Sequence, residues 1–270
     1  MTLLFSILLA AEEPPKAKDR SRLLEGMGGD LQVFEVPESS GADFTDANSY
    51  IVCDRSSGEA MVIDAGSRSA QSALRRAEEE KLKITLLVST HFHGDHTGGN
   101  AMVLEKTQAK MVAPLREAAL VTGEALTASD KKQLLTFSTP RVDVKAKQGD
   151  ELRLGGHPVK VIEVGGHSPG SICLHFPDEK LLFTGDVLFK GAIGRIGLPH
   201  GSKTPDDLVK AIRSKLLVLP DDTIVLPGHG PTTTLGAERT ENPWLKPPPK
   251  PEKTDKGKTS GKAASDKAKR

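Results

Sequence analysis

Cysteine is scarce in this chain, and so are net charge and long apolar runs. Two cysteines, Cys53 and Cys173, allow neither a disulfide framework nor a Cys-x-x-Cys metal site. Both stand within apolar runs, so we expect buried thiols on strands. A formal net charge of +1 gives no general reason to expect an acidic partner. No apolar run is long enough to cross a bilayer, so we expect no membrane-spanning helix.

The two ends of the chain differ in composition from the rest. Residues 246–270 carry nine basic residues against three acidic ones and no aliphatic side chain larger than alanine, so we expect a disordered basic tail. No aromatic residue is interleaved with its lysines, and we therefore expect no nucleic-acid partner. Residues 1–24 form a leader whose apolar run, Leu3 to Ala11, resembles the hydrophobic part of a secretory signal. Because no basic residue precedes that run and Leu9 stands near the cleavage point, export and a cytoplasmic location both stay open.

Residues 25–245 have the pattern of one domain that mixes strands and helices. Short β-type runs occupy 31–36, 49–54 and 59–64. Alanines and a leucine at helical spacing then predict a helix over about 69–82. No internal repeat and no long low-complexity segment interrupts this range. The composition and the order of elements indicate the α/β class.

The histidines are concentrated in one short run. Three of the chain's eight histidines and one aspartate fall within six consecutive positions, HFHGDH at 91–96. Residues two apart in an extended segment point to the same side, so His91 and His93 can face one ion. The glycine that follows permits a sharp turn, after which Asp95 and His96 can serve a second position nearby. The run therefore predicts metal ligands.

Four apolar, strand-like runs each lead to a ligand-type residue, and these residues are His91, His167, Asp186 and His229. Loops that a sheet supports are where sites are usually built. If the four strands run the same way in one sheet, the four segments converge on one edge. Imidazole and carboxylate suit zinc, iron, manganese or cobalt, and suit calcium or magnesium poorly. Five histidines and two aspartates exceed what one tetrahedral ion takes, and they fit two ions that share a carboxylate.

Four segments in this order resemble the metallo-β-lactamase superfamily, and within it the short glyoxalase II-type hydrolases. These segments are HFHGDH (91–96), GGHSPGS (165–171), FTGD (183–186) and PGHGP (227–231). The resemblance covers about 31–245, and it implies a four-layer αββα sandwich with the site at one edge. It also implies two divalent metal ions, with zinc favoured over iron or manganese. The implied ligands are His91, His93 and His167 for the first ion, Asp95, His96 and His229 for the second, and Asp186 as the bridge between them.

The same resemblance implies a reaction. It is the hydrolysis of an acyl thioester, as in hydroxyacylglutathione hydrolases, by a hydroxide shared between the two ions. Asp95 is then both a ligand and the group that orients the nucleophile. The classical enzymes add a C-terminal helical domain with tyrosine and basic contacts to glutathione; this chain has one tyrosine, Tyr50, and resembles the shorter members. Asp186 disfavours antibiotic hydrolysis, because the true β-lactamases lack the bridging aspartate.

Three other interpretations stay open. A persulfide dioxygenase of the same fold would use a single iron on His91, His167 and Asp186. Lactones or other esters would be hydrolysed at the same two-metal site. A non-enzymatic binding protein would keep the fold and act through its basic tail. Structural roles are expected for the remaining histidines, which are His157, His175 and, nearest to the predicted site entrance, His200.

Overall fold

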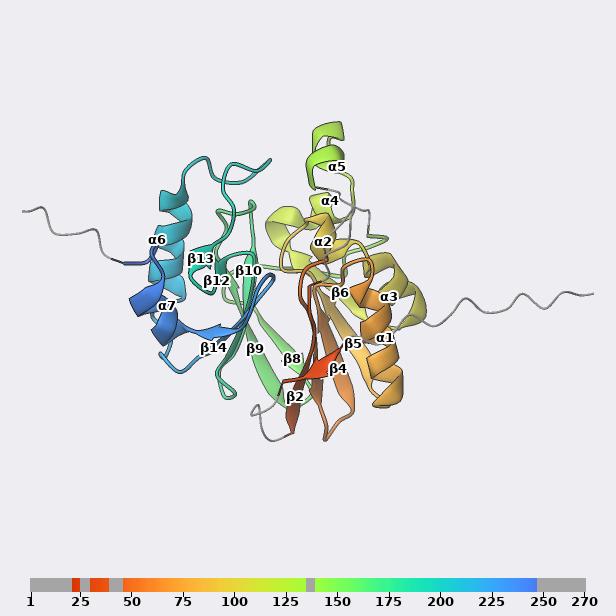
Figure 1. Cartoon of the computed structure of the whole chain (residues 1–270). Helices are drawn as coiled ribbons and strands as arrows, with labels where there is room; N and C mark the ends of the chain where they lie inside the picture. The colour runs from red at the N-terminus through yellow and green to blue at the C-terminus, as the bar shows by residue number, and fades with distance from the viewer. Residues whose placement is uncertain (1–20, 25–29, 39–45, 135–138, 247–270) are drawn as a thin grey trace, which may run out of the picture.

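Two β-sheets pack face to face, and helices cover the outer face of each sheet (Figure 1). The computed structural model describes residues 21–24, 30–38, 46–134 and 139–246. The predicted four-layer αββα arrangement is confirmed. Most of the predicted leader and nearly all of the basic tail lie outside the described residues. Within the described part of the chain, no helix combines the length and apolar character that crossing a membrane requires.

The first sheet has seven strands in chain order. The pairings among its first four strands are antiparallel, and the pairings from the fourth to the seventh strand are parallel. The three β-type runs predicted from the sequence are confirmed as its second, third and fourth strands. The strands are β1 (Arg22–Leu23), β2 (Leu31–Val36), β3 (Ser49–Asp54), β4 (Glu59–Ile63), β5 (Lys83–Val88), β6 (Lys110–Pro114) and β7 (Val144–Ala146).

The second sheet has six strands in the order β15-β14-β11-β10-β9-β8, with β11 and β14 parallel and the other pairs antiparallel. A separate small hairpin pairs two strands that follow β11. The sheet strands are β8 (Glu151–Leu154), β9 (His157–Glu163), β10 (Ile172–Phe176), β11 (Leu181–Gly185), β14 (Ile224–Pro227) and β15 (Thr233–Thr234), and the hairpin strands are β12 (Leu188–Phe189) and β13 (Ala192–Ile193).

The four strands that lead to ligand-type residues do not share one sheet, and the sequence-based hypothesis was wrong on this point. β5 belongs to the first sheet, whereas β9, β11 and β14 belong to the second. β9 and β11 are both antiparallel to β10, so they run in the same direction, and β14 is parallel to β11. Short, largely apolar strands occur in both sheets, as β5 and β11 show, which is why the sequence could not assign the strands to one sheet or the other.

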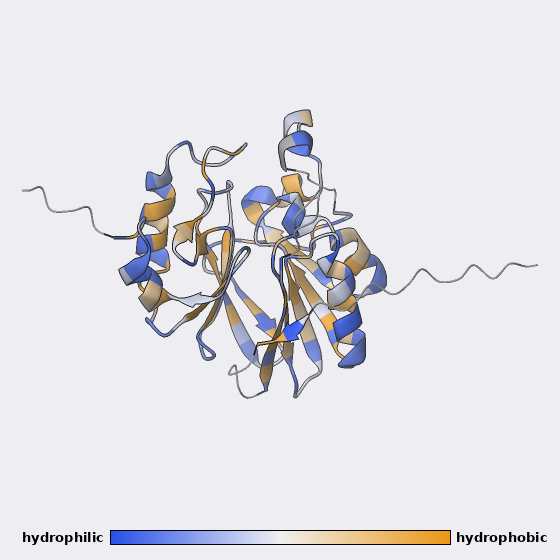
Figure 2. Ribbon diagram, in the orientation of Figure 1, coloured by the Kyte–Doolittle hydropathy of each residue, from blue (hydrophilic) through white to orange (hydrophobic). Residues whose placement is uncertain are grey.

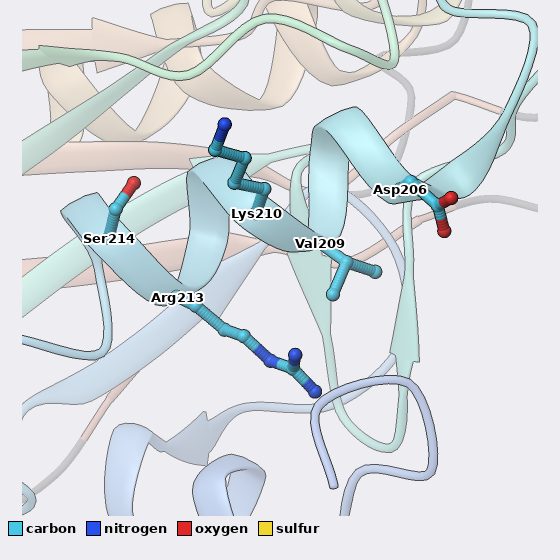
Figure 3. A pocket seen from close by; sticks show the side chains of 5 residues that line it. All are labelled: Asp206, Val209, Lys210, Arg213 and Ser214. Carbon is cyan, nitrogen blue, oxygen red and sulfur yellow. The ribbon is translucent and has the colours of Figure 1, made fainter. Parts of the chain in front are cut away.

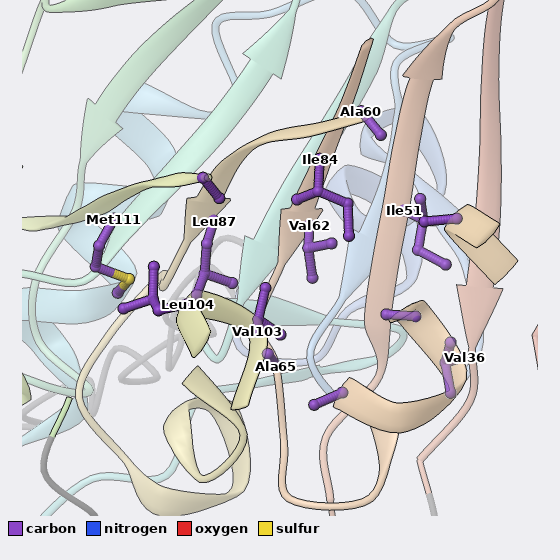
Figure 4. Packing of buried hydrophobic residues seen from close by; sticks show 14 of the residues in the cluster. Val36, Ile51, Ala60, Val62, Ala65, Ile84, Leu87, Val103, Leu104 and Met111 are labelled. Carbon is purple, nitrogen blue, oxygen red and sulfur yellow. The ribbon is translucent and has the colours of Figure 1, made fainter. Parts of the chain in front are cut away.

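Helices pack on the sheets through small or branched apolar residues. In β4, Met61 and Ile63 face the second sheet, while Ala60 and Val62 face the helical layer, as alternation along a strand requires. Figure 4 shows Val103 and Leu104 beside strand residues of the first sheet, and Figure 2 shows that the hydrophobic residues concentrate between the layers. The covering helices are α1 (Ser69–Glu79) and α3 (Asn100–Lys106) on the first sheet, and α6 (Pro205–Lys215) and α7 (Leu235–Glu241) on the second.

Two further expectations concern α1 and the thiols. The predicted helix is confirmed from Ser69, and it ends at Glu79 rather than near Leu82, because Lys81 adopts a left-handed conformation with φ of 54°. Both cysteines are free and fully buried, as predicted. The remaining helical segments are α2 (Gly94–Thr97), the 3₁₀ turn Leu115–Glu117, α4 (Ala118–Val121) and α5 (Ala128–Leu134).

Candidate metal centre

The HFHGDH run bridges the end of β5 and a short helix. His93 has an extended backbone with φ of −64° and ψ of 149° and stands directly before α2. The single turn of α2 then brings the His96 ring back beside that of His91, with 4.1 Å between the ring centroids. Gly94 begins α2 and is not among the glycines with positive φ, so the turn follows from the helix and does not use the conformational freedom that the sequence suggested.

The first group of ligand-type atoms comes from both sheets. His91 Nε2 lies 2.9 Å from His93 Nδ1, and His167 Nε2 lies 3.0 Å from the same His93 nitrogen. Asp186 Oδ2 completes the group at 3.4 Å from His167 Nε2. All four side chains are buried, and their ligand atoms lie within 4.8 Å of one another.

The second group adjoins the first through the other oxygen of Asp186. Asp186 Oδ1 lies 3.2 Å from His96 Nε2 and 3.7 Å from His229 Nε2. Asp95 Oδ2 lies 3.1 Å from the same His229 nitrogen and 3.7 Å from His96 Nε2. Tertiary structure thus brings together all seven side chains that the sequence singled out, in two groups with Asp186 between them.

The donor chemistry of both groups fits metal ions. In the first group, burial lowers the pKa of His91 well below its usual range and that of His93 to about 3, so these imidazoles are neutral and offer lone pairs. Burial disfavours the charged form of Asp186, but the neighbouring His96 outweighs it and holds the pKa of the carboxyl well below its usual range. His96 Nε2 and Asp186 Oδ1 are buried and neither makes a hydrogen bond. Burial disfavours the charged form of His96, but Asp95 and Asp186 outweigh it and raise the pKa of His96 well above its usual range in the metal-free chain. An ion that displaces this proton would satisfy both atoms.

Several outward-facing ring nitrogens of the histidines are held by partners that fix ring orientation. His96 Nδ1 lies 2.9 Å from Asp64 Oδ2, His167 Nδ1 lies 2.9 Å from the carbonyl oxygen of Arg195, and His229 Nδ1 lies 2.9 Å from Glu38 Oε2. Such outer partners orient metal-ligating imidazoles and raise their basicity. These rings are therefore aimed by the protein itself.

Asp64 is a functional residue that the sequence interpretation missed. It follows β4 directly, adopts a left-handed conformation with φ of 56°, and accepts hydrogen bonds from both the backbone N–H and the hydroxyl of Thr90. It therefore joins the ends of β4 and β5 beneath His96. The strand-end signal that identified the other carboxylates applies equally to Asp64, and would have found it.

The other three histidines lie outside both groups. His157 pairs with Glu179 at 2.5 Å, and His175 is buried on β10. His200 pairs with Asp130 of α5 at 3.1 Å, and its ring centroid lies 5.9 Å from that of Phe92. Since Phe92 stands between two of the ligand-type histidines, His200 is the one nearest to the metal centre, as expected from its position in the sequence.

A surface hollow of about 530 Å³ lies elsewhere, on the outer face of α6. Figure 3 shows its lining, which consists of Asp206, Val209, Lys210, Arg213 and Ser214. All five side chains come from one helix, and none belongs to the metal centre. An open depression of this kind lacks the convergent polar groups of a ligand site.

The comparisons with known proteins agree with this geometry. A family model described as the metallo-β-lactamase superfamily matches residues 42–229. The hydroxyacylglutathione hydrolase GloC of Haemophilus influenzae is 36% identical over 192 residues, which cover 69% of this chain and 87% of that protein.

Two solved structures are similar throughout most of their length. The B3 metallo-β-lactamase BLEG-1 superposes with a TM-score of 0.68 at 32% identity, covering 74% of this chain and 95% of that one. TTHA1623, solved in a di-iron-bound form, superposes with a TM-score of 0.61 at 28% identity, covering 83% of this chain and 99% of that one.

Proposed function

This chain belongs to the metallo-β-lactamase superfamily, and from that premise we propose that it is a binuclear metal-dependent hydrolase that acts on acyl thioesters. The observation that carries the proposal is the division of one carboxylate between two ligand groups. Asp186 turns Oδ2 toward the first group and Oδ1 toward the second. A mononuclear iron site would need only three of the seven side chains, so the complete second group favours two ions.

In this proposal the two ions are held by the ligand sets that the motifs implied. His91, His93 and His167 hold the first ion, with Asp186 as the bridge. Zinc is favoured, and iron or manganese suit the same mixture of nitrogen and oxygen donors. When bound, such a pair supplies a Lewis acid and lowers the pKa of a shared water toward neutrality. The second ion is held by Asp95, His96 and His229, on the other side of the Asp186 carboxylate from the first.

Two side chains of the second group reach solvent, whereas the third, His96, is buried. Asp95 is 24% exposed and His229 is 28% exposed, whereas the His91 ring is completely buried. With ions bound, the carboxylate of Asp95 would orient the attacking water, and the burial of the first group would keep bulk water away from its ligands.

The thioester substrate is proposed from the similarity to a named relative and from the share of that relative's length that the chain matches. The relative of H. influenzae named a hydroxyacylglutathione hydrolase is matched over 87% of its length. The chain therefore aligns with nearly the whole of a protein that carries this name. A small-molecule thioester is the substrate class that we assign to the site.

The test begins with elemental analysis of protein purified without chelators or an affinity metal. Two equivalents of zinc, iron or manganese per chain support the binuclear site, and turnover is then measured on hydroxyacyl-glutathione thioesters, a lactone, an aryl ester and a chromogenic cephalosporin. Preferential cleavage of the thioesters supports the proposal. Cleavage of only the other substrates would reject the substrate class. One iron per chain, together with oxygen uptake on glutathione persulfide, would reject the hydrolase proposal and support the dioxygenase interpretation.

A further inference from the structure

Glu117 is a buried carboxylate beside the first ligand group. It ends the 3₁₀ turn Leu115–Glu117 that follows β6, and its exposed fraction is 0%. Its Oε2 accepts a hydrogen bond of 2.9 Å from the backbone N–H of Phe92. Its Oε1 accepts one of 2.7 Å from the backbone N–H of Gly170 and another from the hydroxyl of Ser168. One carboxylate thus accepts three hydrogen bonds from two different loops.

Both loops carry ligands of the first group. Phe92 stands between His91 and His93, in the segment that follows β5 of the first sheet. Ser168 follows His167, in the segment that follows β9 of the second sheet. The two oxygens of Glu117 therefore connect ligand segments that belong to opposite sheets.

The same two segments are also joined at their base. The backbone N–H of Ile172 donates to the carbonyl of Thr90 at 3.0 Å. That bond joins the two segments where β5 ends and β10 begins. Glu117 adds a second link, from Phe92 to Ser168 and Gly170, so the spacing of the first group is set at two places.

A buried carboxylate at this position does not by itself favour stability. Burying a charged group carries a desolvation penalty that hydrogen bonds only partly offset, and apolar replacements of buried ionic groups are often neutral or stabilising. What a carboxylate offers is two oxygens that only accept hydrogen bonds, one for each loop. No apolar side chain can hold two backbone N–H groups at a set distance.

We propose that Glu117 is a positioning residue that sets the distance between the His91–His93 segment and His167, and that it thereby determines how tightly the first ligand group binds its ion. This inference rests on the proposed metal-binding role of the seven side chains. It adds a residue that touches neither the ions nor the substrate, and it predicts an effect on one of the two ions only.

The test compares Glu117→Gln with wild type. A glutamine keeps one oxygen but places an NH₂ group against a backbone N–H, of either Phe92 or Gly170, so one of the two loops is released. The metal-free proteins are titrated with Co²⁺, and the visible absorption bands and the affinity of each equivalent are recorded. We expect one equivalent to bind about 10- to 100-fold more weakly, with an altered spectrum, while the other is unchanged.

Glu238→Gln is the matched control. Glu238 is also buried, at 2% exposed, and it accepts hydrogen bonds from a backbone N–H, a hydroxyl and an amide group, of Gly191, Thr233 and Asn242. Both variants should lower the melting temperature, since each disrupts a buried carboxylate. Only Glu117→Gln should change Co²⁺ binding. Equal losses in the two variants, or wild-type Co²⁺ binding in Glu117→Gln, would overturn the proposal.

Ser168→Ala provides a second route if Glu117→Gln does not fold. It removes one of the three hydrogen bonds and leaves both backbone bonds in place, so a smaller loss in the same equivalent is expected. Unchanged binding of both equivalents in that variant would count against the proposal. Because the readout is Co²⁺ affinity, a failure of the thioester assay leaves this test intact, whereas wild type that binds no Co²⁺ would reject the metal centre and the role of Glu117 together.

Discussion

Asp186 is the residue on which the two ligand groups depend jointly. Replacing it by asparagine keeps the size and one oxygen, but turns an NH₂ group toward one of the two groups. We predict that Asp186→Asn binds at most one metal equivalent and that hydrolysis falls by at least roughly 100-fold. Elemental analysis and thioester turnover measure both effects.

Asp54→Asn is the control for that experiment. Asp54 is also buried, and it lies at the end of β3, where it accepts hydrogen bonds from Ser56, Ser57 and Gly156 rather than from any ligand. The Asp54→Asn variant should have a lower free energy of unfolding and an unchanged metal content. Two full equivalents in Asp186→Asn would show that this carboxylate is not shared.

Gly228 is needed because its neighbours leave no room for a side chain. A Cβ at this position would lie 2.4 Å from Asp186 Oδ1 and 2.7 Å from His96 Cε1, that is, against the carboxylate between the two groups and against a member of the second group. Gly228→Ala should therefore weaken metal binding by roughly 10-fold or more. Gly156→Ala is the control, since a Cβ there meets nothing within 4 Å. Unchanged metal affinity in Gly228→Ala would contradict the close approach of these residues.

Glu117 also gives a pH dependence with a definite sign. Burial raises its pKa from 4.5 to about 7, against hydrogen bonds from Ser168, Gly170 and Phe92 that lower it. At pH values between 4.5 and about 7, Glu117 holds a proton in the folded, metal-free chain that it has released in the unfolded chain. The chain's free energy of unfolding must therefore fall as pH rises through the window, by up to about 3 kcal/mol. Glu117→Gln removes this contribution.

The measurement is urea unfolding of both metal-free proteins at about pH 5 and about pH 7.5. The stability of wild type relative to Glu117→Gln should be greater at the lower pH. A difference that is the same at both pH values would show that Glu117 titrates normally.

At the scale of the elements, the position of each cysteine on a buried strand determines how accessible its thiol is to reagents. Cys53 on β3 faces the helical layer, and Cys173 on β10 packs in the apolar cluster beneath α6. Both are completely buried, and burial raises the pKa of each thiol. We predict that neither thiol reacts with a disulfide reagent in the native protein and that both react in denaturant. Rapid modification of one thiol under native conditions would mean that its strand opens.

Strand ends likewise explain why the ligand-type residues could be recognised from sequence. His91, His167, Asp186 and His229 each come after a short apolar run, because a strand that packs in the core must end before a loop can present polar side chains. The same signal marks Asp64 after β4. It does not mark Glu117, which comes from a 3₁₀ turn among apolar residues, and a lone glutamate there gives no sign of the two loops that it contacts.

At the scale of the whole molecule, the metal centre joins the two sheets. His91 and His93 follow the first sheet, and His167 and Asp186 follow the second. An ion that binds only the folded chain stabilises it by about 2.7 kcal/mol at 100 times its dissociation constant. Removal of the metals by a chelator should therefore lower the melting temperature by about 5 to 10 °C for each ion lost, for a domain of this size.

Calorimetry with and without chelator measures this shift, and added zinc should restore it. Asp186→Asn provides the control, because its melting temperature should respond to zinc less than that of wild type. A melting temperature that neither the chelator nor zinc changes would mean that the sheets associate without help from the centre.

The sequence by itself determined the class of the fold, the strands β2 to β4, the helix α1, and the seven ligand-type side chains that the structure brings together. These are properties of short segments, since alternation, helical spacing and a run such as HFHGDH are all encoded locally. Only the tertiary structure decided that β5 lies in one sheet and β9, β11 and β14 in the other. It alone brought Glu117 against two ligand loops, because contacts between segments far apart in the chain depend on how the layers pack and not on any local pattern.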